Sequence, residues 1–344
     1  MSKQKQLNCG VIGLGRVGKM HVENILTMQD INIVAVSDYF IDSISDWLDE
    51  IGIEKRTTDY AELLDIPEIE AVFIFTSTDT HEEIVTAAAK KGKHIFCEKP
   101  LSMSLDEESS LKVLRAVKEN NVKLQMAFNR RFDPQFRNIY NMVRDNKIGE
   151  PQMVKITSRD PDLLPYDLIQ RIGGLIFDFT MHDFDMARYM IGSDITEIYV
   201  KGNTLIDPKL KEIGDIDTLS IILEFENGAF GMIDNSRRAV YGYDQRVEVF
   251  GSEGMLIADN VNASSVTYYN KDQVETKKPL PIFTERYKEA YINEVKFFAD
   301  SILNNAPIVC TGEDVFIAQQ VAIAAQKSLE LGQPVKVNKI PVKP

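Results

Sequence analysis

Asp178 and His182 are the residues whose types and spacing point most directly to proton transfer. They lie four positions apart in the segment DFTMHDFDMARYM, and residues at this spacing share one face of a helix. A carboxylate one turn from a histidine can orient the imidazole and raise its basicity, and the ordinary pKa of histidine is near neutral. The same spacing occurs on ordinary helix surfaces, but Gly173-Gly174 just upstream favours a functional site. We therefore expect Asp178 and His182 to be a catalytic pair.

Lys99 is the third candidate catalytic residue. It precedes Pro100 at the end of the apolar run HIFCEKP, and a proline disfavours helix at the residue before it, which predicts an extended corner there. Oxidation of a secondary alcohol needs a hydride acceptor, a base and a group that stabilises the developing alkoxide, and a lysine can supply the last of these. The alternative is a solvated lysine. No cluster of Cys and His has the spacing of metal ligands, so no metal is predicted.

The run GLGRVG at 13–18 predicts a dinucleotide-binding loop, because it follows a short apolar strand and precedes a helix-like segment. In this context the first glycine permits a tight turn, the second lets the backbone approach a pyrophosphate, and the third lets the helix pack on the strand. The helix N-terminus offers free amides to the phosphates. The expected cofactor contacts in the loop are Gly13, Leu14, Gly15, Arg16, Val17 and Gly18.

Asp38 decides which dinucleotide is expected. It ends the second predicted strand, 20 residues after Gly18. A carboxylate at this place accepts hydrogen bonds from the ribose hydroxyls of adenosine and repels a 2′-phosphate. No Lys or Arg follows within VSDYFIDS, so NAD is predicted over NADP. The alternative is that Asp38 only caps the next helix.

These residues need a scaffold, and the first half of the chain predicts one. Apolar runs at 7–12, 31–38, 71–77, 94–100 and 122–128 alternate with helix-like segments. Such alternation is typical of a parallel sheet with right-handed crossovers. The carboxyl ends of strands in such sheets are where ligands bind, which places Lys99 and the glycine loop at the same edge.

The pattern changes after about residue 128. A helix is expected over 133–147, then strands within 151–158, 196–203, 218–235 and 245–259, with turns at Asn227-Gly228 and Ser252-Glu253-Gly254. We expect an α/β protein: an N-terminal Rossmann domain over 1–127 and, over 128–344, an α+β domain with a large, mostly antiparallel open sheet. Helices at about 285–335 could pack back on the first domain.

Composition excludes several classes of partner. The net charge is −13 and no Lys/Arg block interrupts it, so neither nucleic acid nor an anionic membrane is an expected partner. No signal peptide and no apolar run long enough to span a bilayer are found, which predicts the cytoplasm. Cys9, Cys97 and Cys310 are far apart and odd in number, so buried free thiols are expected. His21 and His94 are also expected to be packing or capping residues.

Several segments together resemble the glucose–fructose oxidoreductase / inositol dehydrogenase family. They are GLGRVG, TDTHEEIVTAAAKKGKHIFCEKPLS, FNRRFDP and GGLIFDFTMHDFDMARYM, and the resemblance covers essentially the whole chain. The sequence SRDP at 158–161 is most similar to the inositol 2-dehydrogenase branch. The resemblance implies a Rossmann domain and a second domain whose open sheet often makes oligomer contacts, so a homodimer or homotetramer is expected.

The resemblance also implies roles for individual residues. Lys99 corresponds to the lysine that contacts substrate and cofactor, and Glu98 beside it belongs to the same cofactor-binding element. Asp178 and His182 correspond to the substrate-binding acid and the general acid/base. The loop that lines the nicotinamide side corresponds here to Ser77, Thr78 and His81. The chain departs from the family pattern at Thr78, where many relatives have proline.

Other polar residues of the second half could bind a polyhydroxylated ring, which needs many directional donors and acceptors. Arg130, Asp160 and Tyr243 are the strongest candidates. Weaker ones are Arg131, Arg159, Tyr241, Arg286 and Tyr291. Asp183, Asp185 and Arg188 are interpreted as the polar face of the helix that carries His182, and the alternative is that they support the site residues from behind.

The predicted function is NAD-dependent oxidation of a secondary ring hydroxyl of a cyclic polyol, with myo-inositol or another inositol isomer favoured. The same chemistry on an aldose, a sugar derivative or a diol is an alternative. A protein that binds NAD and sugar as a sensor without catalysis is a second alternative, which the presence of Lys99, Asp178 and His182 disfavours.

Overall fold

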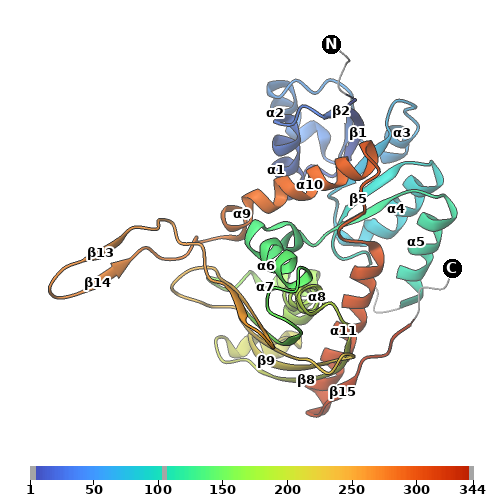
Figure 1. The fold of residues 1–344 in the computed structure, drawn as a ribbon. Coiled ribbons are helices and arrows are strands. Elements are labelled where there is room, and N and C mark those ends of the chain that lie inside the picture. Colours follow the sequence, from blue (N-terminus) through green and yellow to red (C-terminus); the bar gives the residue numbers. More distant parts are fainter. Residues whose placement is uncertain (1–4, 103–106, 341–344) are drawn as a thin grey trace. The chain divides into compact units, whose positions relative to one another are not determined.

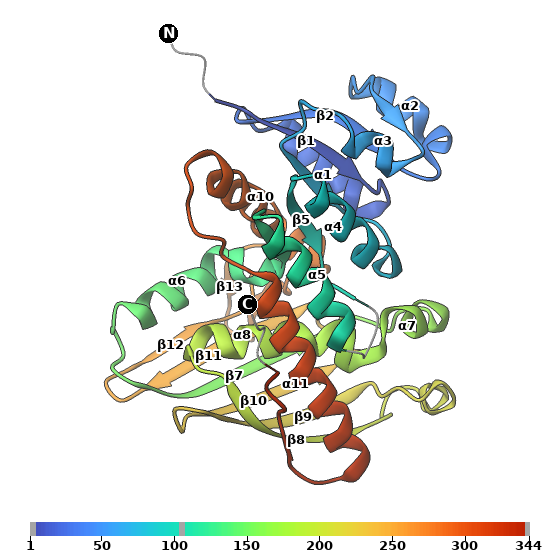
Figure 2. The ribbon, with the colours of Figure 1, turned by 90° about the vertical axis from the view of Figure 1, so that its right-hand side faces the viewer.

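The computed structural model describes residues 5–102 and 107–340. The chain forms two compact units, and neither is a single continuous stretch of sequence. The first unit takes in the chain up to Asn129 together with Ala290–Phe316, and the second comprises Arg130–Glu289 and Ile317–Lys339. Each unit has its own sheet (Figures 1 and 2).

The first unit contains a six-stranded parallel sheet in the order β3-β2-β1-β4-β5-β6. Central strands such as β1 and β4 are apolar on both faces, as expected for parallel strands covered by helices on either side. The strand order reverses between β1 and β4, which is where ligands bind in such sheets. The strands are β1 (Leu7–Ile12), β2 (Ile31–Ser37), β3 (Arg56–Thr57), β4 (Ala71–Ile74), β5 (His94–Glu98) and β6 (Leu124–Ala127).

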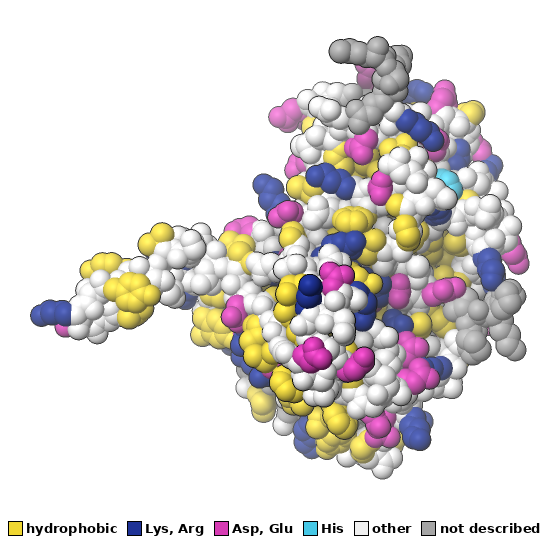
Figure 3. All heavy atoms as spheres, in the orientation of Figure 1, with side chains coloured by type: hydrophobic (Ala, Val, Ile, Leu, Met, Phe, Trp, Pro, Cys, Tyr) yellow, Lys and Arg dark blue, Asp and Glu magenta, His cyan; other side chains and the backbone are white. Residues whose placement is uncertain are grey.

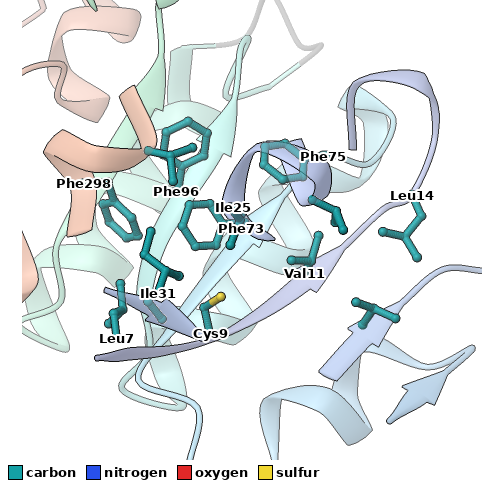
Figure 4. Close-up of a cluster of buried hydrophobic side chains, with 14 of the residues drawn as sticks. Leu7, Cys9, Val11, Leu14, Ile25, Ile31, Phe73, Phe75, Phe96 and Phe298 are labelled. Atoms are coloured by element: carbon teal, nitrogen blue, oxygen red, sulfur yellow. The ribbon is translucent and has the colours of Figure 1, made fainter. Parts of the chain in front are cut away.

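Helices of both ends of the chain accompany this sheet. The later helix α10 (Lys288–Leu303) contributes Val295 and Phe298 to the same hydrophobic core as Phe73, Phe75 and Phe96 (Figure 4). The Phe298 ring centroid lies 5.4 Å from that of Phe73 and 5.8 Å from that of Phe96. The other helical segments are α1 (Arg16–Leu26), η1 (Ile41–Ile44), α2 (Ser45–Glu50), α3 (Tyr60–Leu64), η2 (Thr78–Thr80), α4 (His81–Lys90) and α5 (Glu107–Glu119).

The second unit contains a seven-stranded sheet in the order β12-β11-β7-β10-β9-β8-β15. All neighbouring pairs are antiparallel except β7 and β10, which run parallel. The mostly antiparallel sheet predicted from the sequence is therefore confirmed. The strands are β7 (Pro151–Arg159), β8 (Ile195–Asn203), β9 (Thr218–Phe225), β10 (Phe230–Ser236), β11 (Asp244–Gly251), β12 (Met255–Ala258) and β15 (Val335–Lys336).

Helix α8 (Met181–Ile191) packs on strand β7 and covers one face of this sheet (Figure 2). A separate hairpin of β13 (Thr267–Tyr269) and β14 (Val274–Thr276) extends from the unit with exposed apolar side chains (Figure 1). The remaining helical segments are η3 (Asn129–Phe132), α6 (Pro134–Arg144), α7 (Tyr166–Ile172), η4 (Leu175–Thr180), η5 (Pro208–Ile213), α9 (Phe283–Arg286) and α11 (Gly312–Leu331).

Two expectations from composition can be compared with the structure. Within residues 5–102 and 107–340, every helix is too short or too polar to cross a bilayer. Cys9, Cys97 and Cys310 are all buried free thiols, as predicted. Burial raises the pKa of Cys9 and of Cys97, so neither thiol is ionised near neutral pH.

Candidate active site

The glycine loop connects β1 to α1, and each glycine has a separate steric reason. Gly13 has φ +94°, which L side chains rarely adopt, and its N–H donates to Ser37 O at 2.8 Å. A Cβ at Gly18 would lie 2.1 Å from Gly13 O, so only glycine lets the helix pack this closely. A Cβ at Gly15 would meet no atom within 4 Å. The space beside Gly15 is therefore open for a pyrophosphate, and the loop fits a dinucleotide.

Asp38 lies just after β2, and its carboxylate is joined to this loop. Its Oδ2 accepts a hydrogen bond from Leu14 N at 2.6 Å, and its Oδ1 accepts one from Phe40 N at 2.8 Å. Each carboxylate oxygen can accept a further hydrogen bond. The half-buried side chain is therefore positioned by the backbone and can still bind ribose hydroxyls. The capping alternative is also partly correct, because Asp38 does bind the Phe40 amide.

The segment after β4 contains Ser77, Thr78 and His81. Ser77 is exposed and Thr78 half-buried beyond the carboxyl end of the strand, where a cofactor contact is predicted. His81 is buried, and its Nδ1 and Nε2 lie 2.8 Å from Pro100 O and 3.1 Å from Thr76 O. His81 therefore links this loop to the segment after β5. Both of its ring nitrogens contact backbone carbonyl oxygens, so the predicted cofactor contact of His81 is not made by a free ring nitrogen.

Lys99 follows the last residue of β5 and is joined to Pro100 by a cis peptide bond. Glu98, Lys99 and Pro100 are each half-buried. Because β4 and β5 are neighbouring parallel strands, their carboxyl ends meet at one edge of the sheet. The first unit thus brings Lys99, the segment 77–78 and the glycine loop to the same edge, as the sequence predicted.

In the second unit, Asp178 and His182 lie on either side of a change in helix type. Asp178 belongs to η4, which is a π-helical turn, and His182 is the second residue of α8. Gly173 and Gly174 enter this turn with φ +91° and +74°. A Cβ at Gly174 would lie 2.7 Å from Asp215 Oδ1, which accepts a hydrogen bond from Leu175 N. Single π-helical turns are frequent at functional sites.

Helix α8 is anchored by a polar network around Asp183, the residue after His182. Asp183 is fully buried, and its carboxylate accepts hydrogen bonds from Arg130, from Ser158 Oγ at 2.6 Å and from Asn235 Nδ2 at 2.8 Å. Thr180 Oγ1 donates to Asn235 Oδ1 at 2.7 Å. The network joins the start of α8 to strands β7 and β10 and so fixes the backbone that carries His182.

Asp183 and Asp185 therefore do not form an exposed polar face, and the alternative of a supporting role behind the site fits their buried positions. Asp185 is also buried, and it accepts hydrogen bonds from Arg131 Nε at 2.8 Å and Nη2 at 2.6 Å. Both acids are compensated by arginines of η3. Arg130, which was predicted to contact substrate, pairs with Asp183 through its Nη1.

Asp160, which lies near Asp178, has a carboxyl group whose pKa is raised. Burial raises the pKa of Asp160 to about 6, the nearby Asp178 carboxylate adds to the rise, and Arg237 opposes it. Arg237 Nη1 lies 3.6 Å from Asp160 Oδ2, and the Arg237 side chain is fully buried. Tyr243 is buried close enough for Asp160 to influence its pKa, which burial raises well above the ordinary value. Asp160 thus lies near Asp178 and near Tyr243.

The weaker candidates are mostly engaged in structural contacts. Arg159 pairs with Asp234, and Tyr241 donates to Asp244 Oδ2 at 2.5 Å. Arg286 pairs with Asp133 in the second unit, whereas Tyr291 belongs to the first. Sequence reasoning missed Arg237, Asn235 and Ser158. Ser158 lies in the SRDP segment that was noticed, but nothing in the sequence singled out Arg237 or Asn235.

Comparison with known proteins identifies the family. Residues 7–128 match the model of the GFO/IDH/MocA oxidoreductase family, NAD-binding Rossmann fold, and residues 136–257 match the GFO/IDH/MocA C-terminal domain. The chain is a member of this family of oxidoreductases. The resemblance found in the sequence, the Rossmann fold and NAD as the cofactor are thereby confirmed.

Individual relatives extend over nearly the whole chain. The chain is 49% identical to the oxidoreductase YrbE of Bacillus subtilis, covering 97% of each protein. It is 42% identical to the myo-inositol 2-dehydrogenase of Thermotoga maritima, covering 97% of this chain and 99% of that protein. It also resembles the structure of scyllo-inositol dehydrogenase from Lactobacillus casei with bound NAD(H) and scyllo-inositol, with a TM-score of 0.89 and 29% identity over 97% of this chain and 99% of that one.

Proposed function

We propose that this oxidoreductase uses NAD to oxidise a secondary ring hydroxyl of an inositol, with myo-inositol favoured, to the ketone. The observation that carries the proposal is that the half-buried Asp160 lies near Asp178, which belongs to the helical turn that leads to His182. This arrangement offers acceptors for neighbouring hydroxyls beside a residue able to take a proton. Relatives named as myo- and scyllo-inositol dehydrogenases support the substrate class.

The proposed roles follow from the chemistry of each side chain. His182 takes the proton of the reacting hydroxyl, and Asp178 orients either the substrate or the imidazole. The ammonium of Lys99 stabilises the developing alkoxide. Bound NAD accepts the hydride. The glycine loop and Asp38 hold the dinucleotide, with Ser77, Thr78 and Glu98 as further cofactor contacts.

Asp160 and Tyr243 are proposed to bind hydroxyls that do not react. A carboxylate can accept hydrogen bonds from two neighbouring hydroxyls, and the phenol of Tyr243 can donate or accept. Arg130 is proposed to act through Asp183, which its Nη1 contacts. The arrangement gives a directional site without any metal ion.

A substrate panel tests the proposal. Inositol isomers, aldoses, simple diols and phosphorylated sugars are supplied with NAD, and NADH absorbance is followed. We expect an inositol to have the highest kcat/KM. If the enzyme oxidises an aldose or a diol but no inositol, the substrate belongs to that class instead. Binding of NAD without reduction by any member of the panel would favour the sensor, and turnover of only phosphorylated sugars would contradict the proposal outright.

His182→Ala tests the identity of the base. We expect it to lower kcat by roughly 10²–10⁴, the usual contribution of a positioned proton-transfer group. The acidic limb of the kcat/KM profile has two possible sources, because the pKa of Asp160 is also raised to about 6. The limb should vanish in His182→Ala and persist in Asp160→Asn. The opposite result assigns the limb to Asp160 and removes His182 from the base role.

We also propose that the protein is a homo-oligomer in the cytoplasm. The face of the second sheet opposite α8 has two rows of side chains, and many of them are exposed and apolar. One row runs through Met255, Phe250, Met153 and Phe230, and the other includes Ile257, Met232 and Ile222. Hydrophobic side chains also gather on the hairpin at the left of Figure 3. The three unpaired cysteines support a reducing compartment.

A further inference from the structure

Behind Lys99, the first unit contains a cluster of ionisable side chains that the proposed reaction does not use. It consists of His21 on α1, Glu98 at the end of β5 and Glu294 on α10. His21 Nε2 lies 3.5 Å from Glu294 Oε1 and 3.7 Å from Glu98 Oε1. His21 and Glu294 are fully buried, and the side chain of Glu98 is 19% exposed. Glu98 is therefore the one member that water or a ligand can reach.

The surroundings of the cluster are apolar. The His21 ring stacks on Phe75 at 4.3 Å with an interplanar angle of 4°, and the rings of Phe96 and Tyr291 meet it edge-on (Figure 4 shows Phe75 and Phe96). Neither nitrogen of His21 and neither carboxylate oxygen of Glu294 makes a hydrogen bond in the described parts of the chain. His21 and Glu98 are ionisable groups beside Glu294, and Tyr291 of the same helix is a third ionisable group at the His21 ring.

This arrangement cannot hold two bare carboxylates and a neutral imidazole. Ionised carboxylates so close together in an apolar interior repel each other, and each loses its hydration. Burial raises the pKa of Glu294 well above the ordinary value of 4.5, and the charge of Glu98 adds to the rise. At neutral pH the cluster must therefore retain a proton or bind a cation. For interacting sites of this kind, the proton belongs to the group rather than to one residue.

We propose that His21, Glu98 and Glu294 share a proton and that this cluster positions the Glu98–Lys99–Pro100 segment. Glu98 is the link, because it is held by the buried pair on one side and is bonded to Lys99 on the other. Pro100 is held independently by His81 Nδ1, 2.8 Å from its carbonyl oxygen. His21 thus lies 3.7 Å from Glu98 and His81 contacts Pro100, so a histidine stands beside each sequence neighbour of the proposed alkoxide-stabilising residue. The positioning role depends on the proposed function of Lys99, whereas the shared proton does not.

A divalent cation is the competing occupant, since one histidine and two carboxylates can ligate one. Metal-bound histidines almost always donate their other ring N–H to an acceptor, and ligating carboxylates are themselves hydrogen-bonded. His21 Nδ1 and the second oxygen of Glu294 have no such partner in the described residues. The structure therefore favours a proton over a metal ion.

Thermal unfolding as a function of pH tests the shared proton without reference to catalysis. The folded state binds more protons than the unfolded state between the ordinary pKa of Glu294 and its raised value, so stability falls as pH rises through this range. Glu294→Gln keeps the size and shape of the side chain and removes its ionisable group. We expect its Tm, measured relative to wild type, to rise steadily from pH 5 to pH 8. Glu289→Gln, an exposed position on the same helix, should leave the profile unchanged.

A difference between Glu294→Gln and wild type that is constant with pH would mean that Glu294 only fills space, and it would overturn the proposal. If Glu294→Gln does not fold, Glu98→Gln replaces it: removing the neighbouring charge lowers the pKa of Glu294 and should flatten the same decline. Metal analysis of the purified protein, with and without added Zn²⁺, completes this arm. If the wild-type protein contains one equivalent of metal and Glu294→Gln does not, the cluster binds a cation and the proposal of a shared proton is overturned.

Kinetics with the best substrate of the panel test the positioning role. Glu294→Ala should lower kcat by roughly tenfold to a hundredfold, the scale of a small displacement of a reacting group. The Kd for NAD should change much less, because the glycine loop is untouched. Glu294→Gln should recover most of the lost kcat. Equal losses in the Ala and Gln variants, or a loss confined to the NAD Kd, would contradict positioning while leaving the pH-dependent stability to be judged separately.

Discussion

At the scale of residues, two buried carboxylates of this protein have very different surroundings. Asp183 is surrounded by Arg130, Ser158 and Asn235, so its charge is compensated where it lies. Glu294 lies beside a histidine and another acid, and its carboxylate makes no hydrogen bond within the described residues. Burial raises the pKa of both carboxylates, but the donors around Asp183 favour its ionised form, whereas the charge of Glu98 opposes ionisation of Glu294. The first arrangement supports the helix of His182, and the second lies behind Lys99.

Asp38 carries the prediction for cofactor choice. Asp38→Asn keeps an acceptor for Leu14 N and removes the negative charge that repels a 2′-phosphate. We expect wild type to favour NAD over NADP by about a hundredfold or more in kcat/KM, and the variant to narrow this ratio by roughly tenfold. The control is Asp42→Asn, at an exposed acid of the next helical turn. Equal use of both cofactors by wild type contradicts the role of Asp38.

At the scale of elements, the glycine loop allows a matched test of folding against binding. A Cβ at Gly18 collides with Gly13 O, whereas a Cβ at Gly15 meets no protein atom. Gly18→Ala should destabilise the protein by about 1–3 kcal/mol, the usual cost of overpacking, and lower its Tm by several degrees. Gly15→Ala should keep the Tm but weaken NAD binding by about tenfold or more, since it fills the space assigned to the pyrophosphate.

Differential scanning calorimetry and NAD titration separate the two effects. The expected pattern is a lower Tm for Gly18→Ala and an NAD-binding defect at unchanged Tm for Gly15→Ala. Normal NAD affinity in Gly15→Ala would place the pyrophosphate elsewhere. An unchanged Tm in Gly18→Ala would mean that the helix moves away from the strand without cost.

Local patterns predicted the elements whose partners are near in sequence. The run 218–235 was expected to form strands joined at Asn227-Gly228, and it forms β9 and β10 with Gly228 at φ +84°. The parallel pairing of β10 with β7 was not predicted, because its partners are more than 70 residues apart and no turn specifies their register. The π-helical turn at Asp178 was not predicted either, because the spacing of apolar and polar residues does not distinguish a single π-helical turn from an α-helix.

The candidate site was predictable to a similar extent. Motifs of the glycine loop, Lys99 and the Asp178–His182 segment identified the residues that touch ligands in the proposal. The supporting residues were not identified, because Asp183 meets Ser158 and Asn235 only after strands from distant parts of the chain come together. Spacing along one helix indicates a common face, but it does not reveal whether that face is buried against a partner that compensates its charge.

At the scale of the whole molecule, the exposed apolar sheet face predicts self-association. Phe230 is 53% exposed in the middle of this face, and Phe230→Glu places a charge where a second copy would bury it. We expect light scattering to give a smaller mass for this variant than for wild type, with its circular dichroism unchanged. Leu26→Glu, an exposed apolar position on α1 of the first unit, should keep the wild-type mass.

A monomeric mass for wild type at micromolar concentration would contradict the oligomer. If both proteins have the same higher mass, the interface lies elsewhere, and the exposed hairpin of β13 and β14 is the next surface to alter.

The discontinuity of the first unit constrains how the molecule is made. Strands β1 to β6 are complete by residue 127, yet Val295, Phe298 and Ala299 of α10 belong to their core. During synthesis the ribosome must add more than 160 further residues before this helix exists, so part of the apolar surface of the Rossmann sheet is exposed to solvent until then. A fragment ending near residue 130 should therefore recruit chaperones or aggregate. Supplying Lys288–Leu303 as a separate peptide should shield the sheet, as the missing helix does in the finished chain.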